Sequence, residues 1–212
     1  MRLYTFWRSS AAYRVRIALH VKGLEFESAA EQLTAGEHQR EAYLTLNPQG
    51  LVPALEDDGF VLAQSLAIIE YLEDTHPEPA LLPAEPRDRA VVRSLAQAIA
   101  CDIHPLNNLR VLNYLKGPLG HEPEQVNGWV RHWIGTGFRS LEELAQRYSG
   151  DGRHLFGGSV TMADVCLVPQ LYNARRFQCD LAPFPTLLTI GAALDALPAF
   201  QRARPEAQPD SR

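Results

Sequence analysis

The sequence predicts an α/β domain with the element order β-α-β-α-β-β-α, followed by an all-helical domain. Three observations lead to this prediction. The spacing of apolar residues switches between strand and helix periods through residues 1–82. Prolines then cluster in HPEPALLPAEP, a composition typical of a semi-rigid linker. Beyond residue 87 the apolar residues recur only at helical intervals. We therefore expect domains over residues 1–82 and 87–212.

The first strand and helix are predicted from the opening residues. Residues 2–7 are rich in aromatic and β-favouring side chains, which indicates a strand. Residues 11–22 carry apolar side chains at helical spacing, and Gly23 ends that helix. Alternation over residues 24–29 indicates a second strand. Residues 37–46 then read as a second helix that ends before Asn47-Pro48.

A hairpin and a third helix complete the first domain. Two short apolar runs flank Asp58-Gly59, a dipeptide that strongly favours a two-residue hairpin turn. Ser65 follows at a position suited to cap a helix through residue 72.

The second half is predicted to be helical throughout. Residues 87–116 form one helical pattern that Pro105 should kink or divide. Residues 125–148 repeat the pattern. Thr161 and Asp164 have capping-box spacing before an apolar run, so we interpret Asp164 as structural rather than catalytic. Weaker helices follow at residues 186–197 and 199–203, and we expect residues 204–212 to be frayed.

Composition and charge exclude several classes of function. A net charge of −5 with dispersed Lys and Arg offers no basic stripe for nucleic acid. No apolar run approaches the ~18 residues that span a bilayer, so no membrane partner is expected. The N-terminus lacks the apolar region of a signal peptide, and we expect a cytoplasmic protein. The three cysteines lack C-x-x-C spacing, which argues against disulfides and a metal site.

The segment RSSAAYRVRIAL joins the first strand to the first helix. Such a junction often carries a reactive cysteine, but none is present here, which excludes a thioredoxin-type redox protein. Ser9 and Ser10 occupy the helix start, where helix capping is one explanation for them. A site that uses sulfur chemistry at this junction must therefore obtain its thiol from elsewhere.

Five motifs resemble the zeta class of the glutathione S-transferases. RSSAAYRVRIAL resembles the class signature S-S-C-x-W-R-V-R-I-A-L, and NPQGLVPAL, QSLAIIEYLE, LLP and VTMADVCLVPQ follow in the order of that class. The resemblance covers nearly the whole chain. It implies a thioredoxin-like domain joined to a helical domain, glutathione as the cofactor, and a homodimer. It departs from the class at Ala11, which stands where the signature has cysteine.

The resemblance also implies a glutathione site in the first domain. Ser9 is the expected donor to the thiol, assisted by Ser10 and the Ala11 amide, because a helix start favours anions. Val52 is expected to present its backbone to the tripeptide through a cis bond to Pro53. The remaining contacts that the resemblance implies are His38, Gln49, Gln64 and Ser65.

The resemblance implies a maleyl substrate with two carboxylates, so positive side chains are expected to bind it. The candidates are Arg8, Arg110 and Arg176, each of which has a surface ion pair as its alternative role. We count Arg8 with Ser9 and Ser10 as catalytic, because it adjoins them. The resemblance further implies glutathione contacts by residues of the helical domain, from the same or a neighbouring subunit: Asp102, His104 and Asn108. Arg14 and Arg16 lie deeper in the first helix and are interpreted as structural.

The implied activity is the glutathione-dependent isomerisation of maleylacetoacetate to fumarylacetoacetate, by thiolate addition, rotation and elimination. Three alternatives remain open from the sequence. The first alternative is that the substrate is maleylpyruvate. The second is a general transferase that acts on α-haloacids and other electrophiles, and the third is a non-catalytic scaffold. Retention of Ser9, Val52-Pro53 and Gln64-Ser65 argues against the scaffold.

Overall fold

The computed structural model of the chain describes residues 1–211 and divides into two units. One unit comprises Met1–Leu81 together with the C-terminal segment that begins at Ala196, and the other comprises Leu82–Asp195. The predicted helical domain over 87–212 differs from this division at its C-terminal end. The difference arises because the last helix packs against the first helix of the chain.

The first unit is built on a four-stranded mixed sheet with the strand order β2-β1-β3-β4. The strands are β1 (Arg2–Thr5), β2 (Glu27–Ala30), β3 (Ala54–Asp57) and β4 (Phe60–Ala63). β1 is parallel to β2 and antiparallel to β3, and β3 is antiparallel to β4. The hairpin predicted at Asp58-Gly59 is confirmed, with φ values of 47° and 82° that suit its tight turn.

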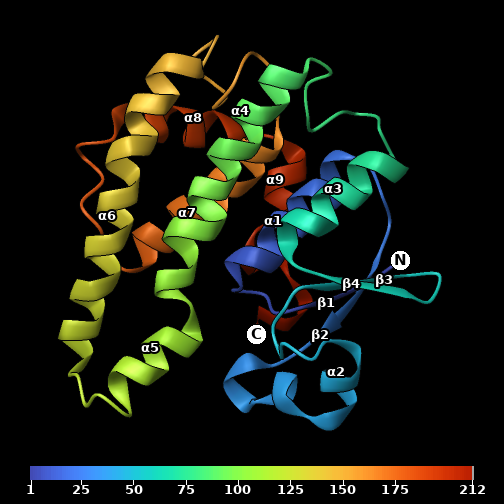
Figure 1. Cartoon of the computed structure of the whole chain (residues 1–212), viewed down its shortest axis with the longest axis vertical. Coiled ribbons are helices and arrows are strands. Elements are labelled where there is room, and N and C mark those ends of the chain that lie inside the picture. The colour runs from blue at the N-terminus through green and yellow to red at the C-terminus, as the bar shows by residue number, and fades with distance from the viewer. Residues whose placement is uncertain (212) are drawn as a thin grey trace. The chain divides into compact units, whose positions relative to one another are not determined.

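Helices cover both faces of this sheet (Figure 1). α1 (Ser10–Val21) and α3 (Ser65–Thr75) pack together on one face, and α2 (Glu41–Leu46) lies on the other. The strand period explains the arrangement, because side chains alternate between the two faces. Tyr4 and Phe6 of the first strand and the turn after it form a core cluster that includes Tyr43 of α2.

The helix predicted over residues 37–46 begins later than expected. A 3₁₀ turn occupies Glu37–Gln39, and Arg40 then adopts an extended conformation with ψ of 146° before α2 starts. Gly36, in the left-handed region with φ of 73°, ends the preceding turn. A 3₁₀ turn and one extended residue therefore replace the first turn of the expected helix.

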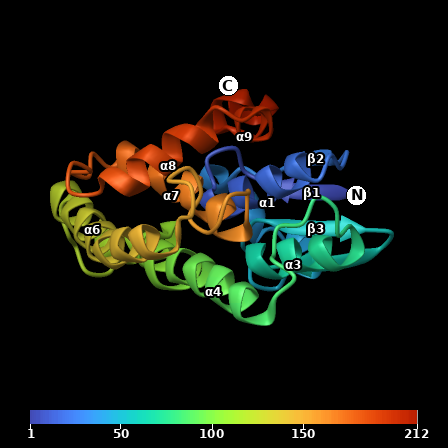
Figure 2. The same ribbon diagram turned by 90° about the horizontal axis from the view of Figure 1, so that it is seen from above.

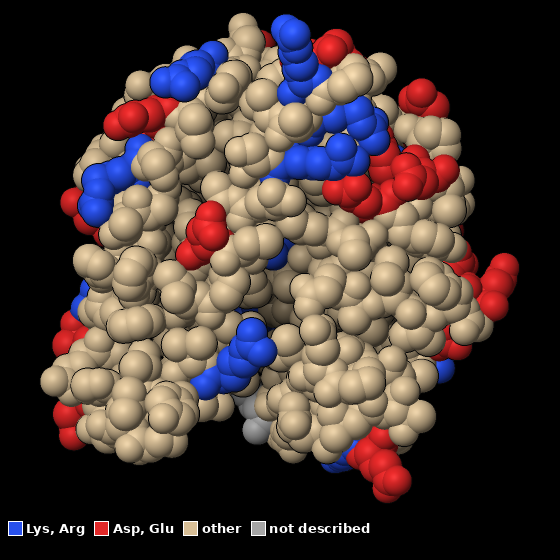
Figure 3. Space-filling view, in the orientation of Figure 1, with Lys and Arg blue, Asp and Glu red and all other residues tan. Residues whose placement is uncertain are grey.

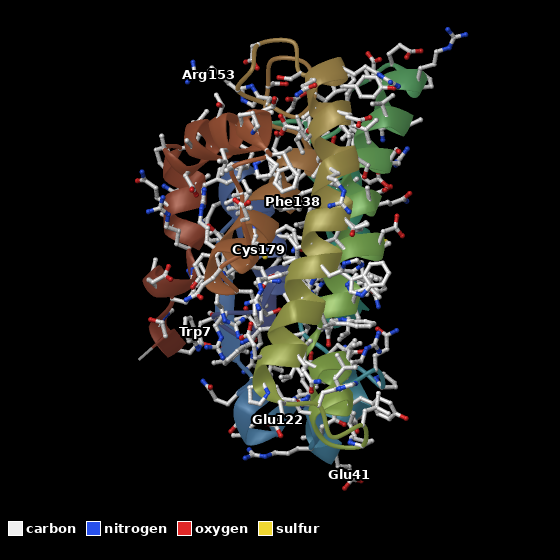
Figure 4. All side chains as sticks on the ribbon, turned by 90° about the vertical axis from the view of Figure 1, so that its left-hand side faces the viewer. Trp7, Glu41, Glu122, Phe138, Arg153 and Cys179 are labelled. Carbon is white, nitrogen blue, oxygen red and sulfur yellow. The ribbon has the colours of Figure 1, made fainter. Side chains whose placement is uncertain are left out.

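The second unit is entirely helical. Its helices are α4 (Pro86–Gln97), α5 (Leu109–Lys116), α6 (Pro123–Tyr148), α7 (Met162–Arg176) and α8 (Pro185–Asp195). α7 is apolar and buried along nearly all its length, and Figure 2 shows α4, α6 and α8 around it. Phe138 points inward from α6 (Figure 4) and meets the Phe184 ring edge to face at 5.6 Å between centroids.

The helical pattern over residues 87–116 is divided, as predicted from Pro105. α4 ends at Gln97, a π-helical turn follows at Ala98–Ile103, and a 3₁₀ turn occupies His104–Asn107. Proline lacks the backbone N–H that would continue the helix. Asn108 is extended, and its side-chain oxygen accepts from the backbone N–H of Arg110 to begin α5.

The expectation that residues 204–212 are frayed is wrong for the described residues of this segment. α9 (Pro198–Ala203) packs against α1, and 3₁₀ turns follow at Pro205–Ala207 and Pro209–Ser211. Gln208 is buried, and its side-chain amide donates to the carbonyls of Arg202 and Arg204 at 3.0 and 2.8 Å. The sequence cue for fraying failed because side-chain hydrogen bonds and burial hold the segment.

The surface agrees with the dispersed charge of the sequence. On the face in Figure 3, acidic and basic side chains are interspersed and separated by wide areas of other residues. None of the helices within residues 1–211 has both the length and the apolar character needed to traverse a bilayer.

Asp164 is the buried carboxylate on which the start of α7 depends. It accepts the backbone N–H of Leu155 at 2.7 Å, and both the N–H and hydroxyl of Thr161 at 2.8 Å. We expect Asp164→Ala to lower the free energy of unfolding by about 3 kcal/mol or more, because each orphaned buried donor costs about 1–3 kcal/mol. Urea denaturation of the purified protein measures this change.

Glu85→Ala is the matched control for that measurement. Glu85 caps α4 with the same type of group, but its bonds to the backbone of Arg87 and Asp88 are exposed. Water replaces those bonds, so we expect a loss of only about 1 kcal/mol. Equal losses in the two variants would contradict the role assigned to burial.

Candidate active site

The register of the sheet brings three loop segments together at the same end of its strands. Tyr4 pairs with Ala54, and Ala54 pairs with Ala63. The turn after β1, the segment before β3 and the junction after β4 therefore leave the sheet at the same end. These segments carry Ser9, Val52 and Gln64, three of the residues that the sequence predicts for one site.

Ser9 caps the first helix. Its backbone N–H donates to the Phe6 carbonyl at 2.9 Å, and its Oγ accepts from the Ala12 N–H at 3.2 Å. A hydroxyl that accepts a hydrogen bond keeps its own proton for donation. The first turn of α1 contains no acidic residue, so the positive end of the helix dipole is not neutralised there. Ser9, Ser10 and the Ala11 amide thus form a helix start suited to an anion.

Arg16 holds the turn that carries Ser9. Its guanidinium is buried and donates to the Thr5 hydroxyl, the Phe6 and Trp7 carbonyls, and the Ala203 carbonyl of the C-terminal segment. Burial lowers the pKa of Arg16 to about 10, which leaves it charged at neutral pH. The structural role predicted for this arginine is confirmed.

Arg14 connects α1 to the start of α3. It is buried, and its Nη1 donates to Ser65 Oγ at 3.3 Å. Ser65 is itself buried as the first residue of α3. The bond ties a predicted site residue of one helix start to the body of another.

The segment before β3 is held by side chains of α2 and its C-cap. Tyr43 Oη and Asn47 Nδ2 both donate to the Leu51 carbonyl, at 2.6 and 2.7 Å. The cis peptide expected between Val52 and Pro53 is present. Gly50 has φ of 57°, and a Cβ there would lie 3.2 Å from the His38 carbonyl, so this glycine lets the two loops approach closely.

Gln64 has the least usual backbone among the predicted site residues. Its φ of 74° and ψ of 114° lie in a region that non-glycine residues rarely adopt, and such conformations cluster at functional sites. Its side-chain Nε2 donates to Gln49 Oε1 at 2.7 Å, and both side chains are exposed. The sequence suggested both glutamines but carried no signal for this backbone conformation.

His38 lies beside these loops with a buried ring nitrogen. Burial lowers the pKa of His38, so its imidazole is neutral at neutral pH. Its Nδ1 is buried without a hydrogen-bond partner among the described residues. A buried ring nitrogen without a partner leaves part of the hydrogen-bonding capacity of His38 unsatisfied.

The predicted residues of the second unit occupy the divided region after α4 and the end of α7. Asp102 is exposed in the π-helical turn, and His104 begins the next turn half-buried. Asn108 caps α5, so part of its hydrogen-bonding capacity is structural. Arg110 and Arg176 are both exposed.

Two of the predicted arginines lie over aromatic rings. The Arg176 guanidinium carbon is 4.7 Å from the Phe177 ring centroid. In the first unit, the Arg8 guanidinium carbon is 5.1 Å from the Trp7 ring centroid. Such cation–π contacts hold a flexible guanidinium side chain in place.

One residue near the site escaped the sequence analysis altogether. Asp210 Oδ2 accepts the backbone N–H of Trp7 at 2.9 Å, across 203 positions of the chain. Nothing local in the sequence signals such a contact, because it depends on where the C-terminal segment packs.

Comparisons with known proteins identify the family of the chain. Residues 1–74 match the family model of the glutathione S-transferase N-terminal domain, and residues 127–202 match that of the C-terminal domain. A probable maleylacetoacetate isomerase of Vibrio cholerae is 51% identical over 99% of this chain and 97% of its own length.

Two solved structures are similar to this chain over all or nearly all of their length. One is a holo maleylpyruvate isomerase, a bacterial glutathione S-transferase of the zeta class, with a TM-score of 0.98 and 49% identity over 100% of both chains. The other is a maleylacetoacetate isomerase of Anaeromyxobacter dehalogenans with dicarboxyethyl glutathione and citrate bound in its active site. Its TM-score is 0.88 and its identity 44%, over 100% of this chain and 97% of that chain. The chain belongs to the zeta class of the glutathione S-transferase family.

Proposed function

We propose that the protein is a glutathione-dependent cis–trans isomerase that converts maleylacetoacetate to fumarylacetoacetate. The observation that carries the proposal is the Ser9 hydroxyl at the uncompensated N-terminus of α1, in a chain similar over its full length to isomerases of maleyl compounds. When bound, glutathione supplies a thiolate that adds to the cis double bond, and leaves again once the new single bond has rotated.

The role of Ser9 follows from the energy of ionising a thiol. A free thiol has a pKa near 8.5, and lowering it by one unit requires about 1.4 kcal/mol of preferential thiolate stabilisation. A hydrogen bond from the Ser9 hydroxyl contributes about 1.5–3 kcal/mol, and the helix terminus about 0.3–1 kcal/mol. Together they lower the thiol pKa by about one to three units. Ser10 and the Ala11 amide add donors at the same helix start.

The loops at the same sheet edge fit the remainder of glutathione. The buried, unpartnered Nδ1 of His38 and the strained backbone of Gln64 are both features that a bound ligand accounts for. In the proposal, Val52 binds the cysteinyl unit through its backbone, while Gln64 and Ser65 bind the γ-glutamyl carboxylate. Gln49 and His38 provide the remaining contacts.

Arginines are proposed to bind the two carboxylates of the substrate. Arg8 adjoins Ser9 and stabilises the negative charge that develops on the substrate during addition. Arg110 and Arg176 supply positive charge from the helical unit. In this proposal the protein acts in the cytoplasm as a homodimer, and Asp102, His104 and Asn108 contact glutathione, from the same or the partner subunit.

Maleylpyruvate is the second candidate substrate, favoured by the similarity to the maleylpyruvate isomerase structure. To test the proposal, each maleyl compound is incubated with the protein, with and without glutathione, and products are identified by chromatography. A fumaryl product that requires glutathione but does not consume it supports the isomerase. The larger kcat/KM identifies the preferred substrate. Net consumption of glutathione with α-haloacids, and no isomerisation, would instead indicate a general transferase.

Ser9→Ala tests the proposed thiol donor. We expect kcat/KM at neutral pH to fall by about 10- to 1000-fold, the loss typical of a removed transition-state donor. Because the thiol pKa rises, the pH at which kcat/KM reaches its plateau should move upward. Steady-state kinetics across a pH series measure both effects, and thermal unfolding reports the separate loss of the helix cap. Unchanged kinetics in the folded variant would exclude Ser9 as the donor.

Gln49 and Gln64 provide a second test, because their side chains are joined by a hydrogen bond. We expect Gln64→Ala to raise the Kd for glutathione by about tenfold or more, since a bond to a charged carboxylate is lost. Gln49→Ala should raise it less. The factor by which the double variant raises the Kd for glutathione should be smaller than the product of the two single-variant factors, because the two residues act as one unit. Calorimetric titration measures all four affinities, and full additivity would contradict the shared role.

A further inference from the structure

The turn that carries Ser9 is bound by Arg16 of α1 and by Asp210, which lies 203 positions from Trp7 in the chain. Arg16 donates to the Phe6 and Trp7 carbonyls and to the Ala203 carbonyl of the C-terminal segment. Asp210 accepts the Trp7 N–H at 2.9 Å. The backbone N–H and C=O of Trp7 are therefore both hydrogen-bonded. Figure 4 shows Trp7 beside the C-terminal segment.

The Asp210 carboxylate is placed at an energetic cost. Its second oxygen, Oδ1, is buried and accepts no hydrogen bond from the described residues. An unsatisfied buried carboxylate oxygen is destabilising unless another interaction offsets it. The positive charge of Arg16 is one such interaction, because the Asp210 carboxylate favours the charged form of that guanidinium. The other is the bond to Trp7.

The C-terminal turns hold Asp210 in place. Gln208 anchors them to the carbonyls of Arg202 and Arg204, and the Ser211 N–H donates to the Gln208 carbonyl. Asp210 thus sits on a fixed segment rather than on a free terminus. A carboxylate fixed in this way restricts the peptide plane between Phe6 and Trp7, which contains the Trp7 N–H. The Ser9 N–H donates to the carbonyl of that same plane, so the position of Ser9 is restricted as well.

We propose that Asp210 is a positioning residue, which fixes the turn after β1 so that the Ser9 hydroxyl is held where the bound thiol ionises. This inference rests on the proposed function for its effect on catalysis. Its structural part, the restriction of the turn, does not depend on any ligand.

The first readout is amide hydrogen exchange of the Trp7 N–H in the ligand-free protein. In Asp210→Ala, and in a chain that ends at Gln208, we expect this amide to exchange about tenfold faster or more, because its acceptor is gone. Asp210→Asn keeps an acceptor oxygen and should stay close to wild type. Asp57→Ala is the matched control, because Asp57 accepts from Tyr71 at the opposite end of the sheet.

The second readout is the pH dependence of kcat/KM. We expect Asp210→Ala to lower kcat/KM at neutral pH by about three- to thirtyfold, with a deficit that shrinks as rising pH ionises the thiol unaided. Asp210→Asn should retain most of the activity. An equal change of the pH profile of kcat/KM in Asp210→Ala and Asp210→Asn would show that the charge of Asp210 matters rather than its hydrogen bond. That result would overturn the proposal.

The outcomes separate this inference from the proposed function. Unchanged Trp7 exchange in Asp210→Ala and in the shortened chain overturns the inference, whatever the activity. Faster exchange with an unchanged pH profile limits Asp210 to a structural role and also overturns it. If wild type shows no glutathione-dependent isomerisation, the proposed function fails. In that case slow exchange in wild type and fast exchange in the variants still support the restriction of the turn.

Discussion

The turn between β1 and α1 is the constraint on which the site depends. A helix N-terminus stabilises an anion only where its first N–H groups and capping hydroxyl are held in place. Here Arg16 binds the carbonyls of that turn, and the Asp210 carboxylate binds the Trp7 amide. Arg16 is buried and also donates to the Thr5 hydroxyl and the Ala203 carbonyl, so the turn is joined to both β1 and the C-terminal segment. Ser9 therefore caps α1 through its oxygen while its hydroxyl proton remains available to a ligand.

The sheet extends this constraint to the rest of the site. Because of the register of β1, β3 and β4, the segments that carry Ser9, Val52 and Gln64 leave the sheet at the same end of its strands. Each is secured by its own bonds. The glutamine pair joins two of the loops, and Tyr43 and Asn47 hold the segment before Val52. Loops that are already held by such bonds lose less conformational entropy when a ligand binds.

Much of the fold could be predicted from the sequence, because its signals are local. Asp58-Gly59 marked the hairpin, Pro105 marked the break after α4, and Thr161 with Asp164 marked the start of α7. Failures arose where distant contacts decide. Residues 204–211 lack periodic apolar residues but are ordered, because Gln208 anchors them and α9 packs on α1.

The site was also predicted only where its signals are local. A serine before a helix indicates a cap, and the family motifs added the glutamines. Neither signal predicted the Gln64 backbone conformation or the Asp210 contact. The central physical claim is that this helix start ionises a bound thiol. The most direct test is a pH titration of thiolate ultraviolet absorbance in the wild-type glutathione complex. The account predicts a thiol pKa about one to three units below its free value near 8.5; an unshifted pKa in the saturated complex would contradict it.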